Sequence, residues 1–123
     1  MKKILIVDDE FDNCETITDA VDSMGLESTF VQDGVKGLVT FLKCQSSSQK
    51  IDLIISDIDM PGGYGIDMVK KIRKRFNKVK ILMISGKDHE DELNELGNKI
   101  DGFMAKPFLP KELIEKIKEI LEV

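Results

Sequence analysis

Four short apolar runs in this chain each end on a reactive side chain. With the residues that end them, the runs are Ile4–Asp9, Leu53–Asp57, Ile81–Ser85 and Phe103–Lys106. Segments of helical periodicity separate them, and apolar runs of this length between helices are typical of buried parallel strands. In open parallel sheets, ligands bind outside the carboxyl ends of the strands. We therefore expect carboxylates, a hydroxyl and an ammonium group to meet at one end of a sheet, a set that indicates phosphoryl and divalent-metal chemistry.

A strand followed by a helix recurs five times along the chain. The expected strands cover residues 4–7, 28–31, 52–56, 80–84 and 102–105. Apolar residues at helical spacing predict helices with anchors in 17–24, 35–42, 68–76, 93–96 and 113–121. Gly25 suits the end of the first helix and Pro110 the start of the last. The more polar strand at 28–31 is expected at a sheet edge. Repeated strand–helix units with right-handed crossovers predict an α/β protein with helices on both faces of a parallel sheet.

Composition narrows the class of protein. A chain of 123 residues, 41% hydrophobic and 33% charged, suits one globular domain. Its net charge of −5 disfavours direct nucleic-acid binding, which normally needs a basic face. No run is long enough for a signal peptide or a membrane span, so we expect a cytoplasmic protein without membrane contact. Cys14 and Cys44 lack metal-ligand spacing and are expected to be reduced thiols.

The acidic residues at the strand ends suggest a metal site. Asp8 and Asp9 close the first strand, and Asp57 closes the third. If these strands are neighbours, like charges crowd together unless a cation intervenes. Mg²⁺ suits such a place, because it takes carboxylate and phosphate oxygens and keeps several waters. Taken alone, the pair Asp8-Asp9 is more simply explained as two acids facing solvent.

The remaining strand ends add a cation and a hydroxyl. Lys106 offers a charge for a phosphoryl oxygen, and Ser85 offers a donor for another. Plainer explanations exist: Lys106 extending to water, and Ser85 capping the following helix. The complete set favours phosphoryl transfer to a carboxylate, since an aspartyl phosphate is a known covalent intermediate. Asp57 is the best nucleophile, because a glycine-rich loop follows it, whereas Asp8 and Asp9 are paired to hold metal.

These pieces resemble the receiver domain of bacterial two-component response regulators. Asp8-Asp9, Asp57–Gly62, Ser85-Gly86 and Lys106–Phe108 stand in that family's order and spacing. The likeness covers essentially the whole chain and predicts one receiver domain over residues 1–123, stand-alone and similar to chemotaxis regulators. It implies a flavodoxin-like (βα)5 three-layer sandwich with a five-stranded parallel sheet of order 2-1-3-4-5.

The resemblance also implies a role for each acidic residue. Asp57 would accept a phosphoryl group from a histidine kinase or a histidine phosphotransfer protein. Asp8, Asp9 and Asp57 would hold Mg²⁺ together with the backbone carbonyl of Asp59. On this basis we expect no turnover enzyme, only self-catalysed phosphoryl transfer and autodephosphorylation.

For the other positions the resemblance implies a switch. Ser85 and Lys106 would bind phosphoryl oxygens, and Phe103 occupies the family's aromatic switch position. Movement of Ser85 and the ring of Phe103 would shift the face built by the fourth helix, fifth strand and fifth helix. That face would control an unidentified protein partner, and the chain would be a monomer or a dimer formed on phosphorylation.

The chain departs from the family's pattern at several places. Gly86 replaces a residue that is usually alanine, which is expected to loosen the loop without removing function. Lys99 stands where a glycine commonly ends the fourth helix, and Gly97 would end it earlier. Asp59 and Lys87 occupy two variable positions beside the site that tune phosphoryl lifetime in the family.

Two further features have plain and sharper explanations. Seven basic residues lie in a short stretch: Lys70, Lys71, Arg73, Lys74, Arg75, Lys78 and Lys80. A solvated helix face is the simpler explanation, and a docking patch for an acidic partner is the alternative. His89 is the only histidine, and we expect it at the surface near a helix start.

Two other classes of function stay open at the level of sequence. Asp57-Ile58-Asp59 is a DxD motif similar to that of haloacid-dehalogenase-type phosphatases, in which the first Asp is the nucleophile. Those enzymes carry DxD on the first strand, however, and here the order is reversed. The last class is a module that keeps the fold but signals by binding alone, which the intact acid–hydroxyl–lysine set disfavours.

Overall fold

The chain folds into a single parallel sheet covered by helices on both faces. The computed structural model describes residues 1–58, 60, 65–86 and 89–123. Within these residues the strands are β1 (Lys3–Val7), β2 (Glu27–Val31), β3 (Leu53–Asp57), β4 (Lys80–Ser85) and β5 (Gly102–Ala105). They pair in parallel in the order β2-β1-β3-β4-β5, so the predicted flavodoxin-like topology is confirmed.

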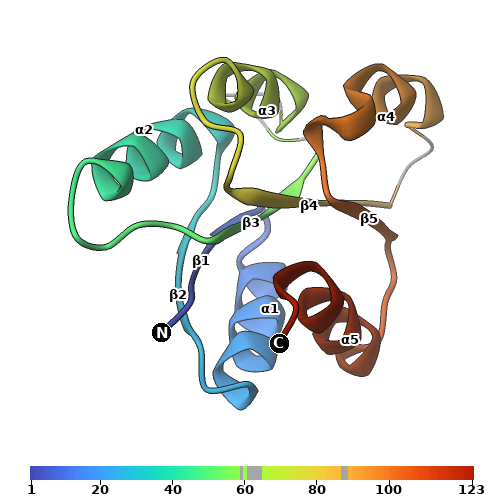
Figure 1. Cartoon of the computed structure of the whole chain (residues 1–123). Coiled ribbons are helices and arrows are strands. Elements are labelled where there is room, and N and C mark those ends of the chain that lie inside the picture. Colours follow the sequence, from blue (N-terminus) through green and yellow to red (C-terminus); the bar gives the residue numbers. More distant parts are fainter. Residues whose placement is uncertain (59, 61–64, 87–88) are drawn as a thin grey trace.

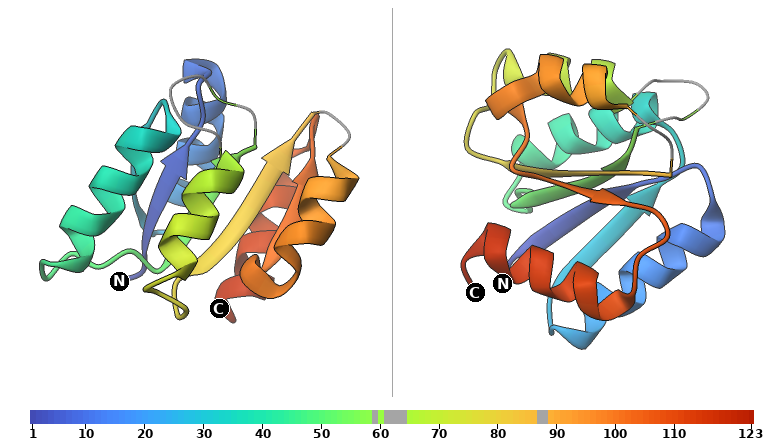
Figure 2. Two further views of the ribbon diagram at one scale, coloured as in Figure 1. Left: turned by 90° about the horizontal axis from the view of Figure 1, so that it is seen from above. Right: turned by 90° about the vertical axis from the view of Figure 1, so that its right-hand side faces the viewer.

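Helices form the outer two layers. On one face lie α2 (Gly34–Gln45), α3 (Gly65–Arg73) and α4 (Glu90–Leu96), and on the other lie α1 (Phe11–Ser23) and α5 (Pro110–Leu121) (Figure 1). A short 3-10 turn, η1 (Gly97–Lys99), follows α4. Figure 2 shows the same layers from above and from the side, with the strands running between the two helical layers.

The strands explain why their sequences are apolar almost throughout. Successive side chains of a strand point to opposite faces. Leu5 and Val7 pack in the cluster under α2, α3 and α4, whereas Ile4 and Ile6 pack in the cluster under α1 and α5. All four side chains of this run are fully buried. A strand covered on both faces therefore shows no alternation, which is the pattern read from the sequence.

Helix ends differ from the sequence expectation in one place. The third helix was expected to carry Phe76, but α3 ends at Arg73. Phe76 lies beyond it, and its ring packs edge-on against Phe41 of α2 at 5.1 Å between centroids. Its apolar contact with the core thus arises from a turn rather than from helical periodicity. The expected ends at Gly25 and Gly97 are confirmed, and both glycines have positive φ.

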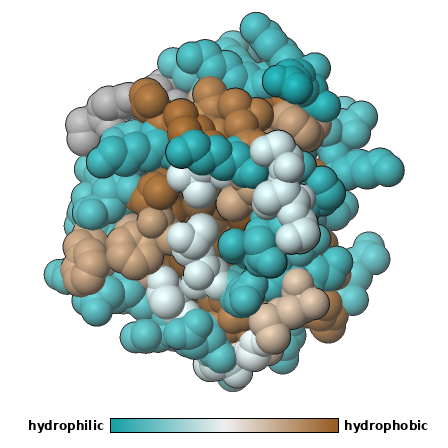
Figure 3. Space-filling view, turned by 90° about the vertical axis from the view of Figure 1, so that its left-hand side faces the viewer, coloured by the Kyte–Doolittle hydropathy of each residue, from teal (hydrophilic) through white to brown (hydrophobic). Residues whose placement is uncertain are grey.

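The outer face of α2 remains apolar. Val35, Val39 and Leu42 are 56%, 46% and 36% exposed, at the spacing of one helical face. Figure 3 views the molecule from the side of α2 and β2, and hydrophobic side chains gather in its upper part among hydrophilic ones. Among the helices of the described ranges, none combines the length and apolar character that crossing a bilayer requires.

Candidate phosphoacceptor site

The ends of four strands meet at one end of the sheet, which we call the carboxyl end. Asp57 is the last residue of β3 and Ser85 the last of β4, while Asp8 follows β1 and Lys106 follows β5. The register aligns these ends, with Asp57 beside Ile84 and Ser85 beside Ala105. Residues nearly a hundred positions apart in the chain therefore share one site because parallel strands end at the same level.

Three carboxylates form a compact cluster there. One oxygen each from Asp8, Asp9 and Asp57 can be chosen so that all lie within 4.8 Å of one another. Asp8 is 1% exposed and Asp57 is 8% exposed, whereas Asp9 is half-buried. Oδ1 of Asp8 accepts a hydrogen bond from the Glu10 N–H at 2.9 Å, which orients that carboxylate. Three hard oxygen donors at this separation are compatible with Mg²⁺.

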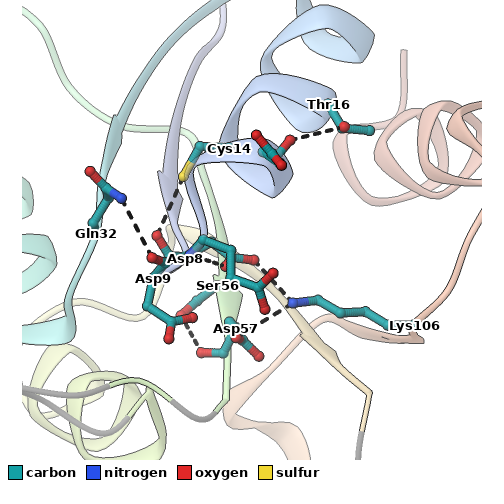
Figure 4. A network of polar contacts seen from close by, with 10 residues as sticks. Asp8, Asp9, Cys14, Thr16, Gln32, Ser56, Asp57 and Lys106 are labelled. Carbon is teal, nitrogen blue, oxygen red and sulfur yellow. Dashed lines mark hydrogen bonds and ion pairs between the residues drawn. The ribbon is translucent and has the colours of Figure 1, made fainter.

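Lys106 brings the only cation that the described residues place in contact with this cluster. Its Nζ lies 3.1 Å from Oδ2 of Asp8 and 3.4 Å from Oδ2 of Asp57. Figure 4 shows the lysine side chain reaching in from β5 with its nitrogen between the two carboxylates. Burial alone would lower the pKa of Lys106, but the charges of Asp8 and Asp57 outweigh it and raise that pKa, so the ammonium form is held.

The charge of Asp57 is less stable than that of an exposed aspartate. Burial raises the pKa of Asp57, and the nearby charge of Asp8 raises it further. Lys106 and the backbone N–H of Ile58 oppose this rise without cancelling it. A partly desolvated carboxylate beside a second negative charge is a group that gains from added positive charge, and it is more reactive than a fully solvated one.

The remaining predicted residues take different positions. Ser85 is buried, 2% exposed, and its backbone carbonyl accepts the N–H of Lys106 at 2.9 Å, which ties the ends of β4 and β5 together. Phe103 is 37% exposed. Asp59, Lys87 and the glycines at 62 and 63 lie outside the described residues. Gly86 has room for a methyl group, since an added Cβ would meet only Cβ of Lys106, at 3.5 Å.

Sequence reasoning missed supporting contacts that three residues make at the site. Ser56 is buried in β3, and its hydroxyl donates to the backbone carbonyl of Asp57 at 2.9 Å. Cys14 was expected on the apolar stripe of its helix, which is confirmed, but its thiol also contacts the carbonyl of Asp8 at 3.4 Å. Burial raises the pKa of that thiol to about 11. Gly65 packs so closely on the backbone of Asp57 and Ile58 that a Cβ would collide with it. A hydroxyl inside an otherwise apolar strand was the available signal for Ser56.

Two expectations about surface residues need revision. His89 was expected at the surface, but its side chain is 10% exposed and its Nδ1 lies 2.9 Å from Oε2 of Glu92. Arg73 was grouped with a solvated basic face, yet its side chain is 9% exposed, and Nη2 pairs with Asp101 at 3.2 Å. Its Nε also donates to the carbonyl of Lys99. Both side chains therefore support the fold locally.

Comparison with known proteins agrees with this geometry. The family model for the response regulator receiver domain matches residues 4–118. The chain belongs to this family. Solved structures of response regulators are also similar to this chain. CheY4 of Vibrio cholerae has a TM-score of 0.83 at 28% identity, covering 98% of each chain. TrrA of Thermotoga maritima, solved in complex with Mg(2+)-BeF, has a TM-score of 0.84 at 32% identity, covering 98% of this chain and 99% of that one.

Longer regulators also match. The alkaline phosphatase synthesis transcriptional regulatory protein PhoP of Bacillus subtilis is 33% identical over 121 residues, which are 98% of this chain and 48% of that protein. The sensory transduction protein RegX3 of Mycobacterium tuberculosis is 30% identical over 122 residues, which are 51% of its length. The chain thus spans about half the length of the curated relatives it matches.

Proposed function

We propose that this receiver domain accepts a phosphoryl group on Asp57 from a phosphohistidine of a histidine kinase or a histidine phosphotransfer protein. The observation that carries the proposal is the position of Lys106, whose Nζ lies 3.1 Å from Asp8 and 3.4 Å from Asp57 at the end of β3. A fixed cation beside a buried carboxylate neutralises charge on an incoming phosphoryl group without having to reorganise.

The transfer exchanges one bond to phosphorus for another. An oxygen of the Asp57 carboxylate attacks phosphorus, and a new O–P bond forms as the N–P bond of phosphohistidine breaks. The electron pair returns to the imidazole ring, which leaves as the neutral base because its other nitrogen carries a proton. Attack by water later breaks the O–P bond, restores the carboxylate and releases inorganic phosphate. The protein acts once per phosphoryl group and does not turn over a separate substrate.

Asp8, Asp9 and Asp57 are the residues that would hold Mg²⁺, with the backbone carbonyl of Asp59 as a further ligand from the family's pattern. When bound, the ion supplies positive charge to the phosphoryl oxygens and offsets the repulsion between the carboxylates. The similarity to TrrA, solved with Mg(2+)-BeF, supports this assignment. The raised pKa of Asp57 supports it too, because burial and Asp8 leave that carboxylate in need of a cation.

Ser85 and Phe103 are the proposed links to a downstream protein. Ser85 ends β4, and its hydroxyl is the proposed donor to a phosphoryl oxygen, while Phe103 stands on the neighbouring strand β5. On activation the ring of Phe103, which is 37% exposed here, would turn inward and shift the face of α4, β5 and α5 between two packings. The proposal also includes an unidentified protein partner and a cytoplasmic location. It further includes a chain that is a monomer or that dimerises on phosphorylation.

The test is phosphorylation by acetyl phosphate with Mg²⁺, followed by intact-protein mass spectrometry. We expect one phosphoryl adduct that is lost on mild alkaline treatment, as acyl phosphates are, and that does not form without Mg²⁺. Asp57→Asn should abolish the adduct. An adduct of unchanged yield in Asp57→Asn would reject Asp57 as the acceptor, and steady release of phosphate over many turnovers would favour a phosphatase instead.

A further inference from the structure

A second surface lies at the opposite end of the sheet, where the strands begin; we call this the amino end. There, a hollow of about 580 Å³ opens between the start of β3, the connection from α3 to β4, and the two chain termini. In the left panel of Figure 2 this connection runs along the lower margin, between the labels of the two termini, while the strands point away from it. Nothing in the proposed phosphoryl chemistry uses this hollow.

Basic side chains dominate the rim. The charged residues that line it are five bases, Lys2, Lys50, Arg75, Lys78 and Lys80, and two acids, Asp52 and Glu122. Asp52 is already engaged, because its Oδ2 accepts the N–H of Lys3 at 2.9 Å. Within the described residues, the side chains of Lys2 and Lys78 form no ion pair. A chain of net charge −5 therefore concentrates positive charge at one place.

The floor of the hollow is apolar. It consists of Ile51, Val79, Ile120 and Leu121, which are 3–9% exposed, and of the half-buried ring of Phe76. The guanidinium of Arg75 lies over that ring at 5.5 Å from its centroid, which places a cation directly beside apolar surface. The site thus offers cations that can pair with carboxylates around its rim, and contact with an aromatic ring inside it.

We propose that this basic hollow docks an acidic peptide segment of a partner protein, with an apolar side chain against Phe76 and carboxylates on the surrounding lysines and arginine. Charge complementarity favours an acidic partner, and the apolar floor favours a peptide over a nucleic-acid duplex, whose phosphate backbone presents no apolar group to place there. Exposed Lys71 of α3 and Lys74, just after that helix, extend the positive charge and favour a segment longer than a single residue.

The position of the hollow predicts that peptide binding there does not depend on phosphorylation of Asp57. It lies at the starts of the strands, whereas Asp57 and Lys106 lie at their ends. Docking at the amino end would hold a partner close while the face of α4, β5 and α5 remains free to respond. We therefore expect the same affinity for an acidic peptide with and without beryllofluoride and Mg²⁺, which mimic the phosphorylated state.

The experiment uses a fluorescent peptide with a leucine–phenylalanine pair between runs of glutamate. Fluorescence anisotropy should report saturable binding to the unmodified protein, weakened by added salt. The double variant Arg75→Glu/Lys78→Glu should bind about tenfold more weakly, since two exposed attractions become repulsions. Lys50→Glu, on the other connection that lines the hollow, is an independent second variant and should weaken binding in the same direction.

Matched controls decide the outcome. Lys111→Glu makes the same charge change as Lys50→Glu, but at an exposed position of α5, and should leave affinity unchanged. A peptide with serines in place of leucine and phenylalanine should bind more weakly if the floor takes part. Equal affinity for the double variant and for Lys111→Glu would overturn the site, as would tighter binding of an oligothymidylate than of the peptide. These results leave phosphorylation of Asp57 untouched, so the two proposals fail separately.

Discussion

The two ends of the same sheet have opposite chemistry. At the carboxyl end, three acidic side chains crowd around one lysine, and Asp8 and Asp57 are at most 8% exposed. At the amino end, five basic side chains stand in water around an apolar floor. Buried charges interact strongly because little water screens them, and packing fixes the distances between them. Water and salt screen the exposed charges. The difference teaches that burial, more than the number of charged groups, decides what a cluster can do: the buried cluster suits chemistry, and the exposed one suits at most weak docking.

The largest expected effect comes from replacing one lysine at each end of the sheet by alanine, in separate variants. Lys106→Ala removes the ammonium group between Asp8 and Asp57, and the rate of phosphorylation by acetyl phosphate should fall by about a hundredfold. Lys78→Ala deletes the same side chain at the amino end and should leave that rate unchanged. The rates are measured by quenched time courses with mass detection. Similar rates for both variants would mean that the position of Lys106 is incidental.

The close approach of Gly65 to β3 gives the next largest effect. An added Cβ at Gly65 would collide with the backbone of Asp57 and Ile58, so Gly65→Ala should lower the free energy of unfolding by about 1–3 kcal/mol. Gly86→Ala at the same end meets only ordinary contact distance and should change it by less than about 0.5 kcal/mol. Urea denaturation measures both. If Gly65→Ala were as stable as Gly86→Ala, the start of α3 could move away from β3 at no cost, and the close contact would not matter for stability.

Replacing an aspartate should change the stability of the protein in opposite directions at the two ends of the sheet. Burial raises the pKa of Asp57, so the folded state binds its proton more tightly than the unfolded chain does. Its contribution to stability is then full below the ordinary pKa of 3.8 and is lost as the pH rises through the raised value. With EDTA present, Asp57→Asn should therefore melt above the unmodified protein at neutral pH, and the difference should shrink in acid.

The matched change at the amino end is Asp52→Ala. It removes the acceptor for the N–H of Lys3 and should lower the free energy of unfolding by about 0.5–1.5 kcal/mol at neutral pH. Thermal scans across a pH series measure both variants. A constant difference between Asp57→Asn and the unmodified protein at every pH would contradict the raised pKa.

The smallest effect concerns the exposed basic face. Lys70 pairs with Glu95 across α3 and α4, with side chains 37% and 60% exposed, so a double-mutant cycle should give a coupling energy close to zero. Asp101 is the contrast, because it accepts from Arg73, whose side chain is 9% exposed, and from the N–H of Ile81. Asp101→Ala should cost about 1–3 kcal/mol by leaving those donors unpaired. Equal costs for Glu95→Ala and Asp101→Ala would contradict the role of burial.

Most of the fold and the core of the site were predictable from the sequence for a physical reason. Buried parallel strands need continuous apolar runs, and the same topology that buries them brings their last residues together, so Asp8, Asp57 and Lys106 could be placed before any coordinates. Phe76 was assigned to a helix because a turn can return an apolar ring to the core at helical spacing. Periodicity does not distinguish the two cases.

The supporting contacts could not be predicted, because they depend on distances between backbones. The thiol of Cys14 reaches the carbonyl of Asp8, and Gly65 is required by the approach of β3, neither of which leaves a pattern in the chain. Arg73 and His89 were assigned to the surface by residue type, yet local partners bury both. Long polar side chains pack their stems and pair their heads, and composition does not reveal when this happens.

Mapping the phosphoryl group to a single residue tests the central claim most directly. Borohydride reduces an aspartyl phosphate to homoserine, and peptide sequencing by mass spectrometry then locates that residue after treatment with acetyl phosphate and Mg²⁺. We predict homoserine at position 57 alone, with unmodified aspartate at positions 8 and 9. Homoserine at position 8 or 9 with none at 57 would contradict the assignment of Asp57 as the phosphoacceptor.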